Sequence, residues 1–208
     1  MEKRKQLIDE VEKYYTSKIR EYGATSQGVD WNGAESQELR FDQFTRLLRG
    51  TESFSLLDYG SGYGAILQYF KPFYEGMKYS GYDISEDMIS KALEVNSEIS
   101  DCEFFSNLEE GRTWDYVVAS GLFNVRLNSE VKDWEDYIIE TIHKFDALCE
   151  KGFAFNILTS YSDLDKQKDY LHYGNPSFYF DYCKRHFSRN VAVLHDYDLY
   201  EFTILVKK

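Results

Sequence analysis

Three glycines recur at alternate positions in one short segment, Leu56-Leu57-Asp58-Tyr59-Gly60-Ser61-Gly62-Tyr63-Gly64-Ala65-Ile66. An apolar run precedes the glycines and a helical pattern follows them, which predicts a strand, a loop and a helix in succession. Such glycines let the backbone turn sharply and approach a ligand more closely than a Cβ atom would allow. The loop also delivers the ligand to the free N–H groups of a helix N-terminus. The sequence therefore predicts a ligand site at Gly60, Ser61, Gly62 and Gly64.

Two acidic residues accompany this loop. Asp83 ends the next apolar run, where a carboxylate can accept hydrogen bonds from both hydroxyls of a ribose. Asp58 comes two residues before Gly60, and a carboxylate there would repel a pyrophosphate but attract the ammonium of an amino-acid moiety. The loop alone leaves a second interpretation open, because Gly60-x-Gly62-x-x-Ala65 also satisfies the dinucleotide fingerprint of dehydrogenases.

The elements around the loop alternate between short apolar runs and helical patterns. This alternation predicts a doubly wound α/β fold with a mostly parallel sheet. Helices are expected at about 85–95 and 134–148, the first with Ser85 as its N-cap. The expected strands are 54–57, 79–82, 102–105, 116–119 and 153–158.

Both ends of the chain depart from this alternation of strands and helices. The runs 191–194 and 200–206 are joined by five residues, too few for a crossover helix, so they are expected to pair as an antiparallel hairpin. The alternation within 202–207 is typical of a strand on the edge side of the sheet. At the N-terminus, one helix is expected to end at Gly23 and a second to run from an N-cap at Ser36 to just before Gly50.

The composition restricts the class of protein. The chain has 208 residues, with 36 acidic against 24 basic side chains and a net charge of −12, which disfavours a nucleic-acid or anionic-membrane binder. No apolar run is long enough to span a bilayer, and three scattered cysteines suit a reducing cytoplasm. We expect one domain, with residues 1–50 as a helical cover, 51–208 as the core and 159–186 as a substrate lid.

The segment Asp58–Gly64, together with Asp83 and the strand 200–204, resembles the class I S-adenosylmethionine-dependent methyltransferases. The resemblance covers residues 54–208. It implies a seven-stranded Rossmann-like sheet whose last strand is inserted antiparallel, with S-adenosylmethionine over the carboxyl ends of the first strands. It further implies that Asp83 holds the ribose, that Ile84 and Met88 line the adenine pocket, and that Ser120 faces the methionine part.

The resemblance also directs attention to less regular positions. Where the family often places an acid near the adenine amino group, this chain has Asn107, whose side-chain oxygen is the expected substitute. In similar enzymes the N-terminal helices close over the cofactor, so Trp31, Gln37 and Arg40 are candidates to meet its carboxylate or the substrate. For Arg40 a solvated position on an amphipathic helix is the competing interpretation.

The connection after the strand 153–158 is rich in aromatic residues, with seven from Tyr161 to Tyr182 when both are included. Because this connection leaves the carboxyl end of the sheet, it is expected to form a pocket wall, although packing onto the sheet is an alternative. Asn175 and Pro176 are expected to begin a helix within it. His172 and Tyr161 are the candidate general bases, and no residues have metal-ligand spacing.

The sequence thus predicts methyl transfer from S-adenosylmethionine to a small molecule or sugar-type acceptor by in-line displacement. A base matters only for a hydroxyl or protonated amine. A nicotinamide-dependent oxidoreductase and a non-catalytic cofactor-binding protein are the alternatives. No nucleic acid or membrane partner is expected, and the aromatic content leaves a homodimer open.

Overall fold

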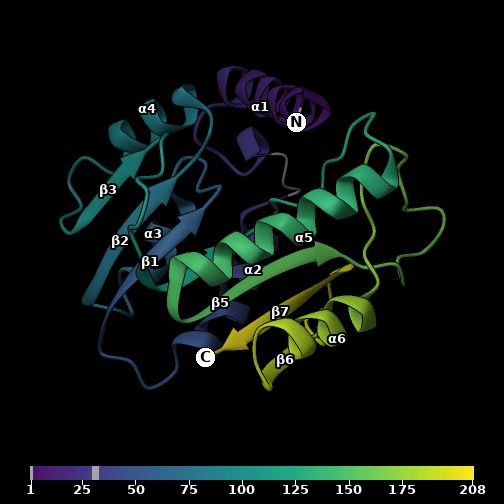
Figure 1. The fold of residues 1–208 in the computed structure, drawn as a ribbon. Helices are drawn as coiled ribbons and strands as arrows, with labels where there is room; N and C mark the ends of the chain where they lie inside the picture. Colours follow the sequence, from purple (N-terminus) through teal and green to yellow (C-terminus); the bar gives the residue numbers. More distant parts are fainter. Residues whose placement is uncertain (1, 30–32) are drawn as a thin grey trace.

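The computed structural model describes residues 2–29 and 33–208, and its centre is a seven-stranded sheet (Figure 1). The strand order is β3-β2-β1-β4-β5-β7-β6. The first five strands pair in parallel, whereas β7 runs antiparallel to both of its neighbours. The predicted α/β sheet with an antiparallel C-terminal hairpin is therefore confirmed. The strands are β1 (Ser53–Tyr59), β2 (Gly76–Tyr82), β3 (Cys102–Phe105), β4 (Trp114–Ala119), β5 (Cys149–Leu158), β6 (Asn190–Leu194) and β7 (Glu201–Lys207).

Helices cover both faces of this sheet, as a parallel sheet requires. One face packs against α5 (Val131–Leu148) and α6 (Pro176–His186), which contribute Trp134, Phe145 and Tyr179 to the larger apolar core. The opposite face packs against α2 (Ala34–Leu48) and α3 (Ala65–Phe70), with Phe44 and Leu67 fully buried. The sheet is therefore packed between two apolar cores, one on each face, which position the ends of its strands.

A third group of elements lies across the carboxyl ends of the first strands (Figure 1). The long helix α1 (Glu2–Tyr22) and the short helix η1 (Gln27–Val29) contact each other, and α1 also contacts α4 (Glu86–Val95). Ile19 of α1 packs in one small apolar cluster with Tyr63 and Met88. Of the expected N-terminal cover, α1 and η1 therefore lie over the ends of the strands from which the glycine loop emerges, whereas α2 packs against a face of the sheet.

Side-chain caps begin two of the helices, at the residues that the sequence predicts. Ser85 caps α4 by accepting a hydrogen bond from the Met88 N–H, and Asn175 caps α6 by accepting from the N–H groups of Ser177 and Phe178. The expected N-cap at Ser36 is wrong. Helix α2 begins at Ala34 after Gly33, and the Ser36 hydroxyl donates to the Gly33 carbonyl inside the first turn. A serine within the first turn can form this local bond as readily as it can cap a helix.

The edge-side position that the alternation predicted for the last strand is wrong, whereas the antiparallel insertion that the resemblance implied is confirmed. β7 lies between β5 and β6, and its residues from Glu201 to Val206 are all buried. Its polar residues have partners from other parts of the chain, since the Thr203 hydroxyl lies 3.0 Å from the Tyr197 hydroxyl. The alternation of polar and apolar residues in β7 therefore reflects satisfied buried groups instead of a solvent-facing side.

Candidate active site

The glycine loop follows β1 and is fastened to the end of β2. The N–H groups of Gly60 and Ser61 both donate to the Tyr82 carbonyl, at 2.7 and 2.9 Å. Gly60 has a φ of +84°, and a Cβ atom there would lie 2.9 Å from Cδ1 of Leu122. A side chain at position 60 is thus excluded both by the backbone conformation and by the opposite wall of the site. Gly64 lies behind the loop as the residue that caps α3.

Asp83 closes the loop from the other side. Its Oδ2 accepts from the Gly62 N–H and its Oδ1 from the Ser85 N–H, both at 2.9 Å. Desolvation raises the pKa of Asp83 to about 6, although the two backbone N–H groups oppose that shift. Each carboxylate oxygen has a second lone pair, so Asp83 can still accept hydrogen bonds from a ligand. The carboxylate is consequently oriented by the backbone before any ligand binds.

Asp58 lies at the bottom of the same site and is 1% exposed. The Tyr79 hydroxyl donates to its Oδ2 at 2.6 Å, whereas Oδ1 has no partner among the described residues. Burial raises the pKa of Asp58 to about 7, with the Tyr79 hydrogen bond opposing and the charge of Asp83 contributing. The buried hydroxyl of Ser61 also lacks a partner among the described residues. Both groups line one small cavity of about 40 Å³, together with Gln37.

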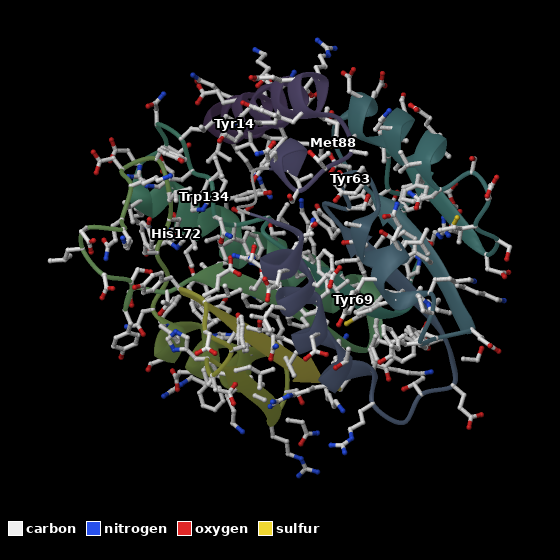
Figure 2. The ribbon with its side chains drawn as sticks, turned by 180° about the vertical axis from the view of Figure 1, so that it is seen from behind. Tyr14, Tyr63, Tyr69, Met88, Trp134 and His172 are labelled. Atoms are coloured by element: carbon white, nitrogen blue, oxygen red, sulfur yellow. The ribbon has the colours of Figure 1, made fainter. Side chains whose placement is uncertain are left out.

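A larger apolar cavity of about 240 Å³ adjoins it. Asp83, Ile84 and Met88 form one part of its wall, and α1 closes the opposite side with Leu7, Val11 and Tyr15, among other side chains. Figure 2 shows Met88 and Tyr63 beneath α1. Gly60, Gly62, Ser120 and Val29 line both the larger and the smaller cavity. The two are therefore parts of one continuous site.

The residues of this continuous site fit a nucleoside that carries an ammonium group. The apolar wall suits a base, and Asp83 is placed for ribose hydroxyls. The unpartnered oxygens of Asp58 and Ser61 suit the ammonium, because a buried polar group without a partner is costly. A pyrophosphate beside the carboxylate of Asp58 would instead be repelled.

Comparison with protein families identifies the chain. The model of the methyltransferase domain family matches residues 17–193. The chain belongs to this methyltransferase family. A putative methyltransferase of Mycobacterium tuberculosis (strain ATCC 25618 / H37Rv) is 44% identical over 165 residues, which are 78% of this chain and 98% of that relative. The predicted class I S-adenosylmethionine-dependent methyltransferase is confirmed, and the nicotinamide alternative is set aside.

Solved structures of low sequence identity share the methyltransferase fold. The DhpI–SAH complex has a TM-score of 0.64 at 15% identity and covers 96% of this chain and 95% of its own. The magnesium protoporphyrin IX methyltransferase ChlM from Synechocystis PCC 6803, with bound SAH, also has a TM-score of 0.64, at 13% identity and 84% coverage of both chains. A SAM-dependent methyltransferase from Aquifex aeolicus has a TM-score of 0.57 at 17% identity, with 92% of this chain and 97% of its own covered.

Three other predicted cofactor residues, Trp31, Asn107 and Arg40, are not among the described residues that line the two cofactor cavities. Trp31 lies outside the described residues. Asn107 is exposed, and its side chain is not among those that line the cavities described above. Arg40 is buried, not solvated, and forms an ion pair with Glu201 while its Nη1 donates to the Ser36 carbonyl. Arg40 lines neither cofactor cavity but a further cavity beside them.

Neither candidate base is among the described residues that line the cavities, although His172 lies between Leu171 and Tyr173, which line the further cavity. His172 is 3% exposed, and its Nε2 lies 3.4 Å from the Tyr179 hydroxyl. Burial, with a contribution from Arg126, lowers the pKa of His172 to about 4, so its ring is neutral at pH 7. In Figure 2, His172 lies well apart from Met88. Tyr161 is 71% exposed. General-base roles for His172 and Tyr161 stay predictions that these positions do not favour.

The further cavity has a volume of about 410 Å³ and lies between α1 and the connection after β5. It shares Tyr15, Val29 and Gly121 with the larger cofactor cavity. Of the aromatic residues in the expected lid, Tyr170 and Tyr173 line it, whereas Tyr179 packs onto the sheet. The connection thus contributes a pocket wall with its first half and core packing with its second.

Glu201, Lys166 and Lys168 are the residues that sequence reasoning missed. Glu201 is completely buried, accepts from Arg40 and from the Asn124 Nδ2 at 2.7 Å, and has its pKa raised by burial. An acid at the start of an apolar strand was the available signal. The two lysines line the further cavity, but nothing in the local sequence distinguishes them from solvated residues.

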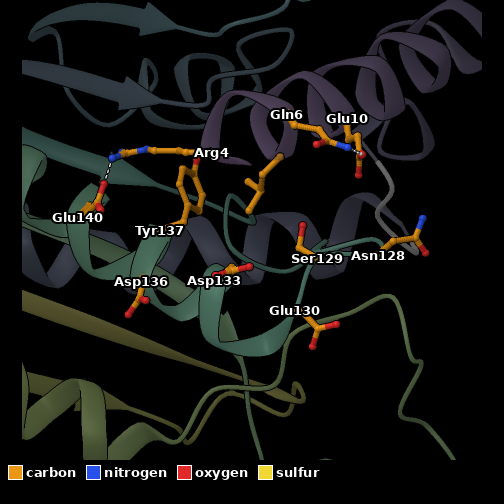
Figure 3. A pocket seen from close by; sticks show the side chains of 11 residues that line it. Arg4, Gln6, Glu10, Asn128, Ser129, Glu130, Asp133, Asp136, Tyr137 and Glu140 are labelled. Atoms are coloured by element: carbon orange, nitrogen blue, oxygen red, sulfur yellow. Dashed lines mark hydrogen bonds and ion pairs between the residues drawn. The ribbon is translucent and has the colours of Figure 1, made fainter. Parts of the chain in front are cut away.

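An acidic cleft between α1 and α5 borders the larger cofactor cavity, with which it shares Leu7 and Tyr137 (Figure 3). Arg4 crosses it to form an ion pair with Glu140. Among the described residues, no cluster of histidine, cysteine and acidic side chains is arranged to hold a metal ion. Nor does the described part of the chain contain a helix that is long and apolar enough to traverse a bilayer. The remaining acidic residues of the cleft are Glu10, Glu130, Asp133 and Asp136.

Proposed function

We propose that the protein transfers the methyl group of S-adenosylmethionine to a small-molecule acceptor. The observation that carries this proposal is the pair of buried, unpartnered oxygens on Asp58 and Ser61 beside the glycine loop. A pocket for a base and ribose alone would not need them. An ammonium group next to a ribose site is a feature of S-adenosylmethionine that a nicotinamide dinucleotide lacks at the corresponding place.

Different residues of the site would bind different parts of the cofactor. Asp83 would hold the ribose hydroxyls, and Ile84 and Met88 would contact the adenine ring. Asp58 and Ser61 would accept hydrogen bonds from the ammonium, with Ser120 beside the methionine part. When bound, the cofactor supplies a methyl group activated by a positively charged sulfur. Helix α1 would cover the bound nucleoside and exclude water from it.

The acceptor would occupy the further cavity, because that cavity adjoins the larger cofactor cavity through Tyr15, Val29 and Gly121. Its residues would hold the acceptor in line with the methyl group, and such alignment supplies most of the rate enhancement in displacements of this kind. A volume of about 410 Å³ suits a small molecule. One structural neighbour, solved with SAH and with SAM, supports this class, since its name refers to a small-molecule substrate, magnesium protoporphyrin IX.

Calorimetric titration with S-adenosylhomocysteine tests the cofactor part of the proposal. The wild-type protein should bind this compound, and Asp83→Ala should weaken the binding by about 1–3 kcal/mol because it removes a charged hydrogen-bond acceptor. Asp181→Ala is the matched control, since Asp181 is an exposed carboxylate on α6 that pairs with Arg185. Equal loss of affinity in both variants, or binding of a nicotinamide dinucleotide in place of S-adenosylhomocysteine, would contradict the proposal.

Only a turnover assay distinguishes this methyltransferase from a non-catalytic cofactor-binding protein. The assay is the release of S-adenosylhomocysteine in the presence of a panel of small carboxylates, amines, phenols and sugars. Bound cofactor without release against the whole panel would favour the non-catalytic alternative. The net charge of −12 makes nucleic acids poor candidates for this panel.

A further inference from the structure

We infer that the methyl acceptor is an amphipathic oxyanion, a small carboxylate or phosphate ester with an apolar body, bound in the further cavity. This inference rests on the proposed function, because it concerns the acceptor of the same reaction. Three properties of the cavity support it: the cationic side chains of its wall, the absence of a base from the described residues of that wall, and the apolar and aromatic side chains beside the charges.

The wall of the further cavity carries positive charge in a protein that is acidic overall. Arg40, Lys166 and Lys168 line it, and no carboxylate does so among the described residues. The whole chain has 36 acidic against 24 basic side chains, so a wall with only cationic charges opposes the general trend. A cavity lined in this way attracts an anion and repels a cation.

Carboxylates outside the described lining pair with two of the three cations. Glu201, which is completely buried, forms an ion pair with Arg40. Asp165 pairs with Lys166 at 3.4 Å, and Asp163 accepts from the Tyr200 hydroxyl at the rim. Lys168 has no carboxylate partner among the described residues, and its Nζ lies 3.4 Å from the Tyr170 hydroxyl. These carboxylates are not among the described residues that line the cavity, so the charged side chains of the described lining are all cationic.

The part of this wall that the structure describes contains no residue suited to remove a proton. Among its described residues there is neither a histidine nor a carboxylate, and lysine and tyrosine are ordinarily protonated at pH 7. A neutral hydroxyl acceptor would have to lose a proton in the reaction, whereas an oxyanion would not. A lone pair of the oxyanion forms the new C–O bond, and the electron pair of the broken C–S bond stays on sulfur. The negative charge of the acceptor and the positive charge of the sulfonium disappear together, so no proton is transferred.

The remaining side chains of the wall suit an apolar body. Val125, Leu158 and Leu171 supply aliphatic surface. Four tyrosine rings line the cavity, and rings of this kind pack against planar or aliphatic groups while their hydroxyls stay near water. The aromatic rings come from Tyr15, Tyr170, Tyr173 and Tyr200.

The test uses the full-length protein saturated with S-adenosylhomocysteine and four simple probes. Benzoate and phenyl phosphate are the anions, and benzamide and phenol are their neutral counterparts. We expect both anions, or one of them, to raise the melting temperature at millimolar concentration and the neutral compounds to leave it unchanged. Stabilisation by only one anion identifies carboxylates or phosphates as the class. No difference between anions and neutral compounds would overturn the inference.

Charge-removing variants make the test specific to this wall. Lys166→Gln/Lys168→Gln should raise the dissociation constant of the stabilising anion about tenfold, since it removes two charged donors. The control is Lys91→Gln/Lys132→Gln, which removes two exposed lysines that pair with Glu94 and Asp136 on the surfaces of α4 and α5. An equal effect in both double variants would show a response to net charge alone and would overturn the inference.

The two proposals can fail separately. If S-adenosylhomocysteine binds but the anions do not, the inference about the acceptor is wrong and the proposed function stands. If S-adenosylhomocysteine itself does not bind to the wild-type protein, the proposed function is wrong. In a turnover assay with S-adenosylmethionine, formation of S-adenosylhomocysteine with benzamide or phenol as acceptor at the rate seen with the anions would also contradict an oxyanion acceptor.

Discussion

Replacement of Asp58 by asparagine should stabilise the unliganded protein at neutral pH and weaken its binding of cofactor. Asp58 is buried and has one unpartnered oxygen, so its negative charge is unfavourable until a positive group lies beside it. In Asp58→Asn the amide oxygen can still accept from the Tyr79 hydroxyl, which donates to Asp58 at 2.6 Å. The substitution therefore removes the charge while it preserves the shape and one hydrogen bond.

The size of the effect follows from the pKa of Asp58. Burial raises this pKa from 3.8 to about 7. Because the folded-state value lies above the unfolded one, the stability contributed by Asp58 is complete below pH 3.8 and is lost as the pH rises to about 7. About 1.4 kcal/mol per pKa unit gives a total loss of about 4 kcal/mol. About 2 kcal/mol of that loss falls between pH 5 and pH 7.

Thermal unfolding of the unliganded wild type and variant at pH 5 and pH 7 measures this difference. The gap in melting temperature should widen by about 4–8 °C in favour of Asp58→Asn at the higher pH. Calorimetry at pH 7 should then show S-adenosylhomocysteine binding weakened by about 1.5–3 kcal/mol, because the ammonium loses its charged partner. A gap that does not change with pH would refute the buried-charge argument. Unchanged affinity would remove Asp58 from the cofactor site.

Two further substitutions test the loop and the buried ion pair. Gly60→Ala forces a residue with a Cβ atom to a φ of +84° and places that atom 2.9 Å from Leu122, so calorimetry should show a loss of cofactor affinity of at least about 1 kcal/mol. Gly111→Ala has a similar φ of +80° in open space and should leave affinity unchanged. Glu201→Gln breaks the buried pair with Arg40 and should lower the free energy of unfolding by about 3 kcal/mol in urea titrations. A loss under 1 kcal/mol would show that the pair contributes little.

The fold was largely predictable because its determinants are local. Short apolar runs separated by helical patterns indicated the parallel strands, and the five-residue link before β7 required an antiparallel pairing. The position of β7 within the sheet depended on distant residues. Glu201 and Thr203 are buried only because Arg40, Asn124 and Tyr197 satisfy them, and no local pattern reveals such partners.

The cofactor site was more predictable than the acceptor site for the same reason. Asp58, Asp83 and the loop glycines lie at the ends of two neighbouring strands, so their spacing in the sequence determines their meeting in space. The wall of the further cavity combines α1, α2 and the connection after β5, and only the folded chain brings Arg40 near Lys166 and Lys168. The imidazole of His172 predicts a general base, but the residues beside it in the sequence do not reveal that the ring is buried against Tyr179.

Val29 lines all three cavities of the site. One of its methyl groups, Cγ1, would lie 3.0 Å from a Cβ atom at Gly62, so it also borders the glycine loop. A change in the size of this one side chain would alter the space for nucleoside, methionine part and acceptor together. Affinity for the methyl donor and choice of acceptor are therefore not independently adjustable at this position, and variants that accept bulkier substrates through position 29 should bind the donor differently as well.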